Sequence, residues 1–217
     1  MNILVIGNEV NRVETAQKFG VQHMYDFAES ISEAKPGLRW AGVIFDFVSA
    51  ATPDALIAYE QISVPVFLDT TFTSLSAIVK AAGLRKMLFG FCGLPTFVNR
   101  ELLEVCIANT SDEIVLKEWS VAVDTKYSLV KDQVGFITPR IICMIINEAY
   151  FTVEEGTATR EDIDLAMKLG TNYPFGPFEW AAKIGMQNVV RILDTAHRSS
   201  GDERYQACNL LRAEATV

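Results

Sequence analysis

The sequence predicts an α/β fold, in which a parallel sheet covered by helices on both faces is followed by an all-α domain. Three observations support this prediction. Apolar runs that suit strands buried on both faces alternate with helical segments between residues 2 and 91. The connections between them are short, as in the crossover units of a parallel sheet. After residue 139 no strand pattern recurs, so the domain boundary is expected between Lys131 and Pro139.

The first domain is predicted to contain five strands and four helices. The strands are expected at residues 2–7, 42–48, 64–70, 87–91 and 127–132, and the helices at 8–20, 52–62, 74–83 and 109–123. Thr52 ahead of Pro53 is a typical helix start. Thr110 and Glu113 have the spacing of a capping box, which predicts that the last of these helices begins there.

The second domain is predicted to contain helices only, at residues 140–156, 159–170, 176–185 and 186–200. A second capping box, Thr159 with Asp162, and Pro177 at a helix start support this interpretation. The first helix carries a wide apolar stripe of Ile141, Ile142, Ile145, Ile146, Ala149 and Val153. Either the other helices wrap this stripe or a second subunit does. For a domain of about 80 residues, a homodimer is the economical interpretation.

Composition excludes several classes of partner. The chain of 217 residues has a net charge of −8 and no run of Lys and Arg among aromatics, which argues against nucleic acid and anionic membrane surfaces. No apolar run is long enough to span a membrane, and no secretory signal pattern opens the sequence, so a cytoplasmic protein is expected. The four cysteines, Cys92, Cys106, Cys143 and Cys208, lack metal-ligand spacing and are interpreted as reduced thiols.

Two long stretches of the sequence resemble the 3-hydroxyacyl-CoA dehydrogenases. "DQVGFITPRI" (132–141) and "NEAYFTVEEGTATREDIDLAMKLGTNYPFGPFEWAAKIG" (147–185) are similar to that family's D-x-x-G-F-[IV]-x-N-R, E-G-x-A-T-x-x-D-I-D and P-[MF]-G-P-F motifs. "FTSLSAI" (72–78) and "FGFCGLPTFVNRELLEVCIANTSDE" (89–113) resemble its N-terminal domain more weakly. The resemblance therefore covers nearly the whole chain.

The resemblance implies a specific architecture and activity. Residues 1–132 would form a truncated Rossmann-like, NAD-binding-type domain. Residues 133–217 would form a helical domain like the C-terminal domain of 6-phosphogluconate dehydrogenase, serving dimerisation and the substrate cleft. The implied activity is that of an oxidoreductase of fatty acid metabolism, which passes hydride from a 3-hydroxyacyl-CoA to NAD.

The residues that the family reaction requires are largely replaced. The hydroxyl proton needs an acceptor with a pKa near the working pH, which is a histidine in the family. Aligned on Pro95, Phe91 stands at the position of that histidine and Leu94 at the asparagine that follows. Pro139, which donates no hydrogen bond, stands at the substrate-binding asparagine. A phenyl ring cannot accept a proton.

Two candidate catalytic residues remain by resemblance. Glu104 falls on the glutamate that orients the histidine, and it could equally be a surface or helix-start carboxylate. Thr73 falls on the serine that binds the substrate oxygen, and it could equally be a helix N-cap. Each keeps the functional group of its family counterpart.

The cofactor loop is also altered. A pyrophosphate-binding turn requires G-x-G-x-x-G, so that the backbone can approach the phosphates closely. Here "GNEVNR" keeps only Gly7, with Glu9 and Arg12 at the other two glycine positions. Asp26 lies about where a ribose-binding acid would be. Gly7 and Asp26 are thus the candidate cofactor-binding residues, with a simple turn and a solvated side chain as the alternatives.

Two functions compete on these grounds. The first is a compact NAD-dependent dehydrogenase that uses Glu104 or Cys92 as an unusual base. The second is a non-catalytic, homodimeric family member that binds an acyl-CoA-type ligand or a partner enzyme, and the replaced residues favour it. A nucleotide-sensing module would need an anion site after Gly7, which Glu9 disfavours.

Overall fold

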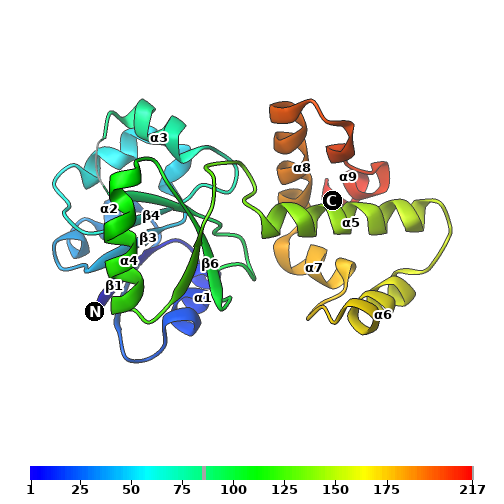
Figure 1. The fold of residues 1–217 in the computed structure, drawn as a ribbon, viewed down its shortest axis with the longest axis horizontal. Helices are drawn as coiled ribbons and strands as arrows, with labels where there is room; N and C mark the ends of the chain where they lie inside the picture. The colour runs from blue at the N-terminus through cyan, green and yellow to red at the C-terminus, as the bar shows by residue number, and fades with distance from the viewer. Residues whose placement is uncertain (85–86, 217) are drawn as a thin grey trace. The chain divides into compact units, whose positions relative to one another are not determined.

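The computed structural model describes residues 1–84 and 87–216, and it divides into two compact units (Figure 1). Residues 1–136 form the sheet unit and residues 137–217 the helical unit. The division falls inside the interval 131–139, where the sequence pattern changes from strands and helices to helices alone.

One sheet of seven strands runs through the described part of the sheet unit, in the order β2-β1-β3-β4-β5-β6-β7. The strands are β1 (Asn2–Ile6), β2 (Met24–Ala28), β3 (Val43–Asp46), β4 (Val66–Asp69), β5 (Leu88–Phe91), β6 (Leu102–Ile107) and β7 (Lys126–Leu129). Neighbouring strands pair in parallel except β5 and β6, which are antiparallel. The predicted Rossmann-like α/β architecture is confirmed, and β2 and β6 are strands that the sequence pattern did not reveal.

Helices cover both faces of the sheet. Side chains of α1 (Glu9–Phe19) and α4 (Glu113–Ala122) join the buried cluster on one face. On the other side of the strands lie α3 (Leu75–Ala82) and the 3-10 helices η2 (Ser49–Ala51) and η3 (Pro53–Tyr59). The remaining short elements are α2 (Ile31–Ala34), η1 (Gly37–Arg39) and η4 (Thr110–Asp112).

Two predicted helix starts are correct only in part. The first of these helices does begin at Pro53 with Thr52 as its N-cap residue, but it is not an α-helix. Residues 53–59 form a 3-10 helix, and Thr52 makes no side-chain cap. The capping box at Thr110 does not form, because residues 110–112 are already wound into η4 and the α-helix begins only at Glu113. Local spacing alone does not show where the winding changes from 3-10 to α.

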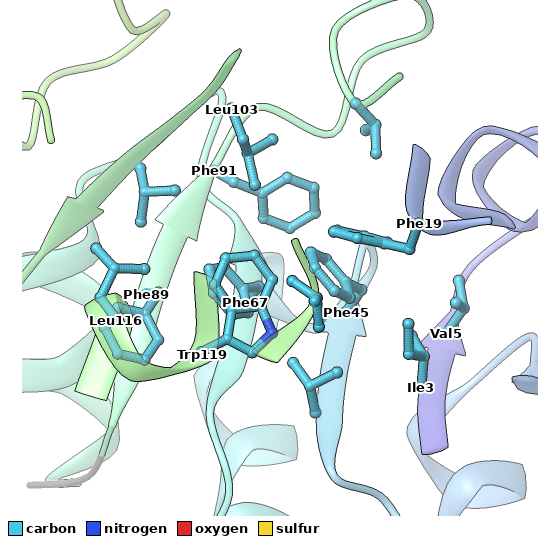
Figure 2. Packing of buried hydrophobic residues seen from close by; sticks show 14 residues of the cluster. Ile3, Val5, Phe19, Phe45, Phe67, Phe89, Phe91, Leu103, Leu116 and Trp119 are labelled. Atoms are coloured by element: carbon cyan, nitrogen blue, oxygen red, sulfur yellow. The ribbon is translucent and has the colours of Figure 1, made fainter. Parts of the chain in front are cut away.

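An aromatic cluster forms the core between the sheet and the helices α1 and α4 (Figure 2). Phe45, Phe67 and Phe89 stack across three adjacent strands, with ring centroids 4.9 and 5.0 Å apart. Trp119 of α4 lies over Phe67 at 4.3 Å, and Phe19 of α1 lies 5.1 Å from Phe45. Burying one such ring contributes about 1.5–3 kcal/mol, so this cluster is a main contribution to holding α1 and α4 against the sheet.

The helical unit consists of α5 (Thr138–Glu154), α6 (Arg160–Thr171), α7 (Pro177–Ile184), α8 (Met186–Ser200), η5 (Glu203–Tyr205) and α9 (Asn209–Ala215). Thr159 caps α6 by accepting from the Asp162 amide at 3.2 Å, as predicted, and Pro177 opens α7. The sequence did not predict α9.

The apolar stripe of α5 packs against α7, α8 and α9 of its own unit. Ile142, Ile146 and Ala149 are buried there, while Ile141 stays half exposed. The first of the two alternatives for this stripe is therefore correct. The width of the stripe does not by itself call for a second subunit.

Candidate functional site

The end of β5 places Phe91 in the core of the sheet unit. Phe91 pairs with Val105 across the antiparallel β5–β6 ladder and is fully buried. Its ring makes edge-to-face contacts with Phe47 at 5.1 Å and with Phe45 at 5.5 Å. Figure 2 shows Phe91 beside Phe45 in the cluster. Directly paired residues point to the same face of a sheet, and Val105 belongs to the same buried cluster as Phe91. Phe91 is therefore a packing residue.

Glu104 points to the opposite face of the sheet from Phe91, because side chains alternate along β6. If the β5–β6 pairing is continued by one residue, Cys92 stands opposite Glu104. Gly90 also precedes Cys92 by two positions, as glycine precedes histidine in the family's G-x-H pattern. The register thus puts Cys92, and not Phe91, beside the orienting carboxylate.

Glu104 is half-buried and shares its face of the sheet with Cys106. The Cys106 thiol lies 3.8 Å from an oxygen of Asp132. Burial, and then this carboxylate, raises the pKa of Cys106 to about 12. This thiol stays protonated at neutral pH and offers no nucleophile or base.

The chain's two histidines lie elsewhere. His23 precedes β2, and burial, followed by the positively charged N-terminus, lowers its pKa. His197 belongs to α8 of the helical unit, with its Nε2 3.9 Å from Glu203. Neither lies on β5 or β6, where the family motif would place the base.

Thr73 is not the N-cap of α3. The cap is Ser74, whose hydroxyl accepts from the Ala77 amide at 3.3 Å. Thr73 stands one residue earlier, half-buried, and its amide donates to the carbonyl of Thr70 at 3.2 Å. Adjacent Ser and Thr offer the same capping chemistry, so the sequence did not distinguish them.

Asp132 holds the start of α3. It accepts from the Ser74 hydroxyl at 2.7 Å and from the amides of Leu75 and Ser76 at 2.8 Å each. Burial raises the pKa of Asp132, but these hydrogen bonds outweigh burial and hold it below the ordinary value. The aspartate of the D-x-x-G-F motif is therefore a structural anchor in this chain.

The two positions that align with family asparagines offer no side-chain donor. Leu94 is 5% exposed in the segment after β5. Pro139 is buried in the first turn of α5. Pro139 suits a helix start, and it supplies no amide to a substrate.

A pocket of about 460 Å³ opens where β1 and β2 end. It is lined by Val5, Gly7, Asn8, Glu9, Arg12, Phe27, Ala28, Glu29 and Glu33. The structure thus places the predicted Gly7 in the pocket. Asp26 lies in the middle of β2 opposite Leu4 and is not part of the lining. Glu29, the residue directly after β2, occupies the pocket instead, and the sequence missed it because β2 itself was not recognised.

The segment that follows β5 is anchored on α1. The Thr96 amide donates to Glu14 at 2.7 Å, and Asn99 donates to Gln17 at 2.9 Å. Thr96 has a left-handed φ of 75°, which is uncommon for a non-glycine residue. Burial raises the pKa of Glu14, with the backbone hydrogen bonds opposing it. A single carboxylate thus holds this turn in place.

No group of three or more His, Cys, Asp or Glu side chains could hold a metal ion in the part of the chain that the structure describes. Over the same residues, no helix is long and apolar enough to cross a membrane. All four cysteines are buried and unpaired by disulfides.

The fold class of the chain is a Rossmann-like sheet unit followed by a helical unit, and a pocket opens where the first two strands end. Within this class, residues 135–215 match the 3-hydroxyacyl-CoA dehydrogenase C-terminal domain family. The (S)-3-hydroxybutyryl-CoA dehydrogenase of Ralstonia eutropha has a similar fold, with a TM-score of 0.75 at 18% identity over 99% of this chain and 93% of that one.

Two curated relatives are similar in sequence. The chain is 44% identical over 88 residues to the 3-hydroxyadipyl-CoA dehydrogenase of Escherichia coli, covering 41% of this chain and 18% of that protein. It is 31% identical over 163 residues to a probable 3-hydroxybutyryl-CoA dehydrogenase of Deinococcus radiodurans, covering 74% of this chain and 55% of that protein.

The chain belongs to the 3-hydroxyacyl-CoA dehydrogenase family. It is similar to the 3-hydroxybutyryl-CoA dehydrogenases of that family, and it spans about half the length, or less, of the curated relatives it matches.

Proposed function

We propose that this chain is a non-catalytic member of the 3-hydroxyacyl-CoA dehydrogenase family. One observation carries the proposal. Where the family motif has its histidine, the chain has a buried phenyl ring, Phe91, followed by Cys92, which is 4% exposed. Glu104 lies on the other face of the sheet from Phe91, and the residue that the continued register sets opposite it, Cys92, carries a thiol and not an imidazole.

The family reaction depends on the imidazole that is missing here. A secondary alcohol releases hydride readily only when its hydroxyl proton leaves at the same time, and general-base catalysis contributes about 10²–10⁴-fold to such a step. A neutral thiol has no basic lone pair comparable to that of imidazole, which is the side chain whose pKa lies near the working pH. Two side-chain donors are missing as well, because Leu94 and Pro139 replace asparagines, and only Thr73 keeps a hydroxyl at the serine position.

The test is the reduction of acetoacetyl-CoA by NADH, followed through NADH absorbance with the purified chain. We expect no turnover above the buffer rate. A rate proportional to protein concentration that disappears in the Glu104→Gln variant would overturn the proposal. A calorimetric titration with acetoacetyl-CoA in the same buffer asks separately whether an acyl-CoA-type ligand binds.

We propose further that the helical unit associates with a second copy of itself. No residue of α6 is buried, and Leu165 and Leu169 are 54% and 77% exposed one helical turn apart. Exposed leucines at this spacing are typical of a helix that packs against another surface. A homodimer through α6 would cover them.

A further inference from the structure

The pocket at the ends of β1 and β2 lies where a Rossmann-like unit binds a dinucleotide. The pyrophosphate needs bare backbone at the first strand–helix turn, free amides at the start of that helix, and no negative charge nearby.

Three amides of the turn, those of Gly7, Asn8 and Asn11, are already paired within the protein. The Gly7 amide donates to the carbonyl of Ala28 at 2.9 Å. Asn8 and Asn11 then cap each other: the Asn8 amide donates to Asn11 Oδ1 at 2.9 Å, and the Asn11 amide donates to Asn8 Oδ1 at 3.1 Å. This reciprocal capping box consumes donors that an anion would need.

The Asn11 side chain also fills the space over Gly7. A Cβ placed on Gly7 would lie 2.6 Å from Asn11 Oδ1. In a dinucleotide-binding turn, glycine keeps this space open for the pyrophosphate. Here a side chain of the protein occupies it.

The charge of the pocket is also unsuited to phosphate. Three carboxylates line it, from Glu9, Glu29 and Glu33, against a single guanidinium from Arg12. Arg12 is held by Glu9 at 3.4 Å and lies over the ring of Phe27 at 4.6 Å. The one cation of the pocket is thus neutralised by a side chain of the protein itself.

The same arrangement recurs at the ends of the next two strands. Asp46, the last residue of β3, accepts from the amides of Val48 and Ser49 at 2.9 Å each. Asp69, the last residue of β4, accepts from the amides of Thr71 and Gly93 at 3.0 Å each. Along this edge, carboxylates of the protein take the backbone donors that a phosphorylated ligand would use.

From these contacts we infer that the ligand-binding edge of the sheet is closed by the protein's own side chains, and that the unit does not hold NAD. The inference does not depend on the loss of catalysis. A family member that lacked only its histidine would still bind NADH, and this chain would not.

The experiment is a titration with NADH, read by nicotinamide fluorescence, on the wild-type chain and on the triple variant Glu9→Gly, Asn11→Ala, Arg12→Gly. The triple variant restores the two missing glycines and removes the side chain above Gly7. We expect no saturation for the wild type. For the variant we expect binding that is at least about tenfold tighter. Glu155→Gly, which removes an exposed carboxylate in the helical unit, is the matched control and should behave as wild type.

Saturable binding of NADH to the wild type in the micromolar range would overturn the inference. A folded triple variant that still fails to bind would also overturn it, because the block would then not lie in these side chains. If the triple variant does not fold, Glu9→Gly with Arg12→Gly keeps the Asn8–Asn11 caps. That double variant removes the Glu9 carboxylate but leaves Asn11 over Gly7, so we expect it to bind NADH more tightly than the wild type, and saturation of the wild type by NADH remains the result that overturns the inference.

Discussion

Phe91 and Glu104 lie on opposite faces of the sheet, because Phe91 pairs with Val105 and side chains alternate along β6. A base at residue 91 could not be oriented by Glu104. The residue that the register brings opposite Glu104 is Cys92. At the end of β5, Phe91 is therefore a packing residue, and Cys92 is the residue on the same face as Glu104.

Phe91→His should therefore lose stability without gaining activity. It would replace a ring packed against Phe45 and Phe47 by a polar one with no partner in the aromatic cluster. We expect a loss of about 2–4 kcal/mol in the free energy of unfolding, measured by urea denaturation. Phe91→Leu, the apolar control, should lose less. Equal losses in the two variants would mean that Phe91 is not enclosed as described.

Asp132→Asn should weaken the start of α3. The amide side chain cannot accept all three hydrogen bonds from Ser74, Leu75 and Ser76, so we expect a loss of about 1–3 kcal/mol. The pKa of Asp132 is lowered in the folded state. Its contribution is therefore complete above the unfolded pKa of about 3.9 and lost as the pH falls through the folded pKa. Urea titrations from neutral to acidic pH should show the wild type and the variant converging.

Glu14→Gln should raise the free energy of unfolding at neutral pH, whereas Asp132→Asn should lower it. The pKa of Glu14 is raised by burial, so the folded state holds its proton more tightly than the unfolded chain does. The ionised carboxylate then costs stability at neutral pH, and this cost disappears as the pH falls through the folded pKa. Because the group is half exposed, we expect Gln to gain only about 0.5 kcal/mol at pH 7, with no gain in acid. A variant that is clearly less stable at pH 7 would contradict this account.

Leu169→Asp should abolish self-association of the helical unit. A carboxylate in the middle of the apolar contact of α6 would be desolvated in a dimer and fully solvated in a monomer. Sedimentation velocity should show a dimer for the wild type and a monomer of unchanged melting temperature for the variant. Val121→Asp, equally exposed on α4 at 75%, is the control and should remain dimeric. A monomeric wild type would remove the proposal.

Much of the fold follows from local sequence patterns. Buried strands such as Val43–Asp46 are continuous apolar runs, and the caps at Thr159 and Gly83 are purely local signals. Met24–Ala28 was missed because it is an edge strand with three exposed residues and no alternating pattern. Because this strand was not predicted, the ribose-binding acid was expected at Asp26 and not at Glu29, the residue directly after the strand.

The candidate site was harder to predict, because it depends on register. Counting back from Pro95 places the family's histidine at Phe91, whereas counting forward from Gly90 places it at Cys92. The spacing between this glycine and this proline therefore differs from that of the family motif. A shift of one residue moves a side chain to the other face of the sheet. Only the pairing of β5 with β6 decides between them.

The most direct test of the central claim is a single-turnover experiment with the protein in excess over (S)-3-hydroxybutyryl-CoA and with NAD in large excess over both. Because no histidine lies on β5 or β6 to accept the hydroxyl proton, we expect that no NADH forms over hours. Stoichiometric NADH, formed by the wild type and lost in both Cys92→Ala and Glu104→Gln, would show that a base works at the end of β5 and would contradict the account.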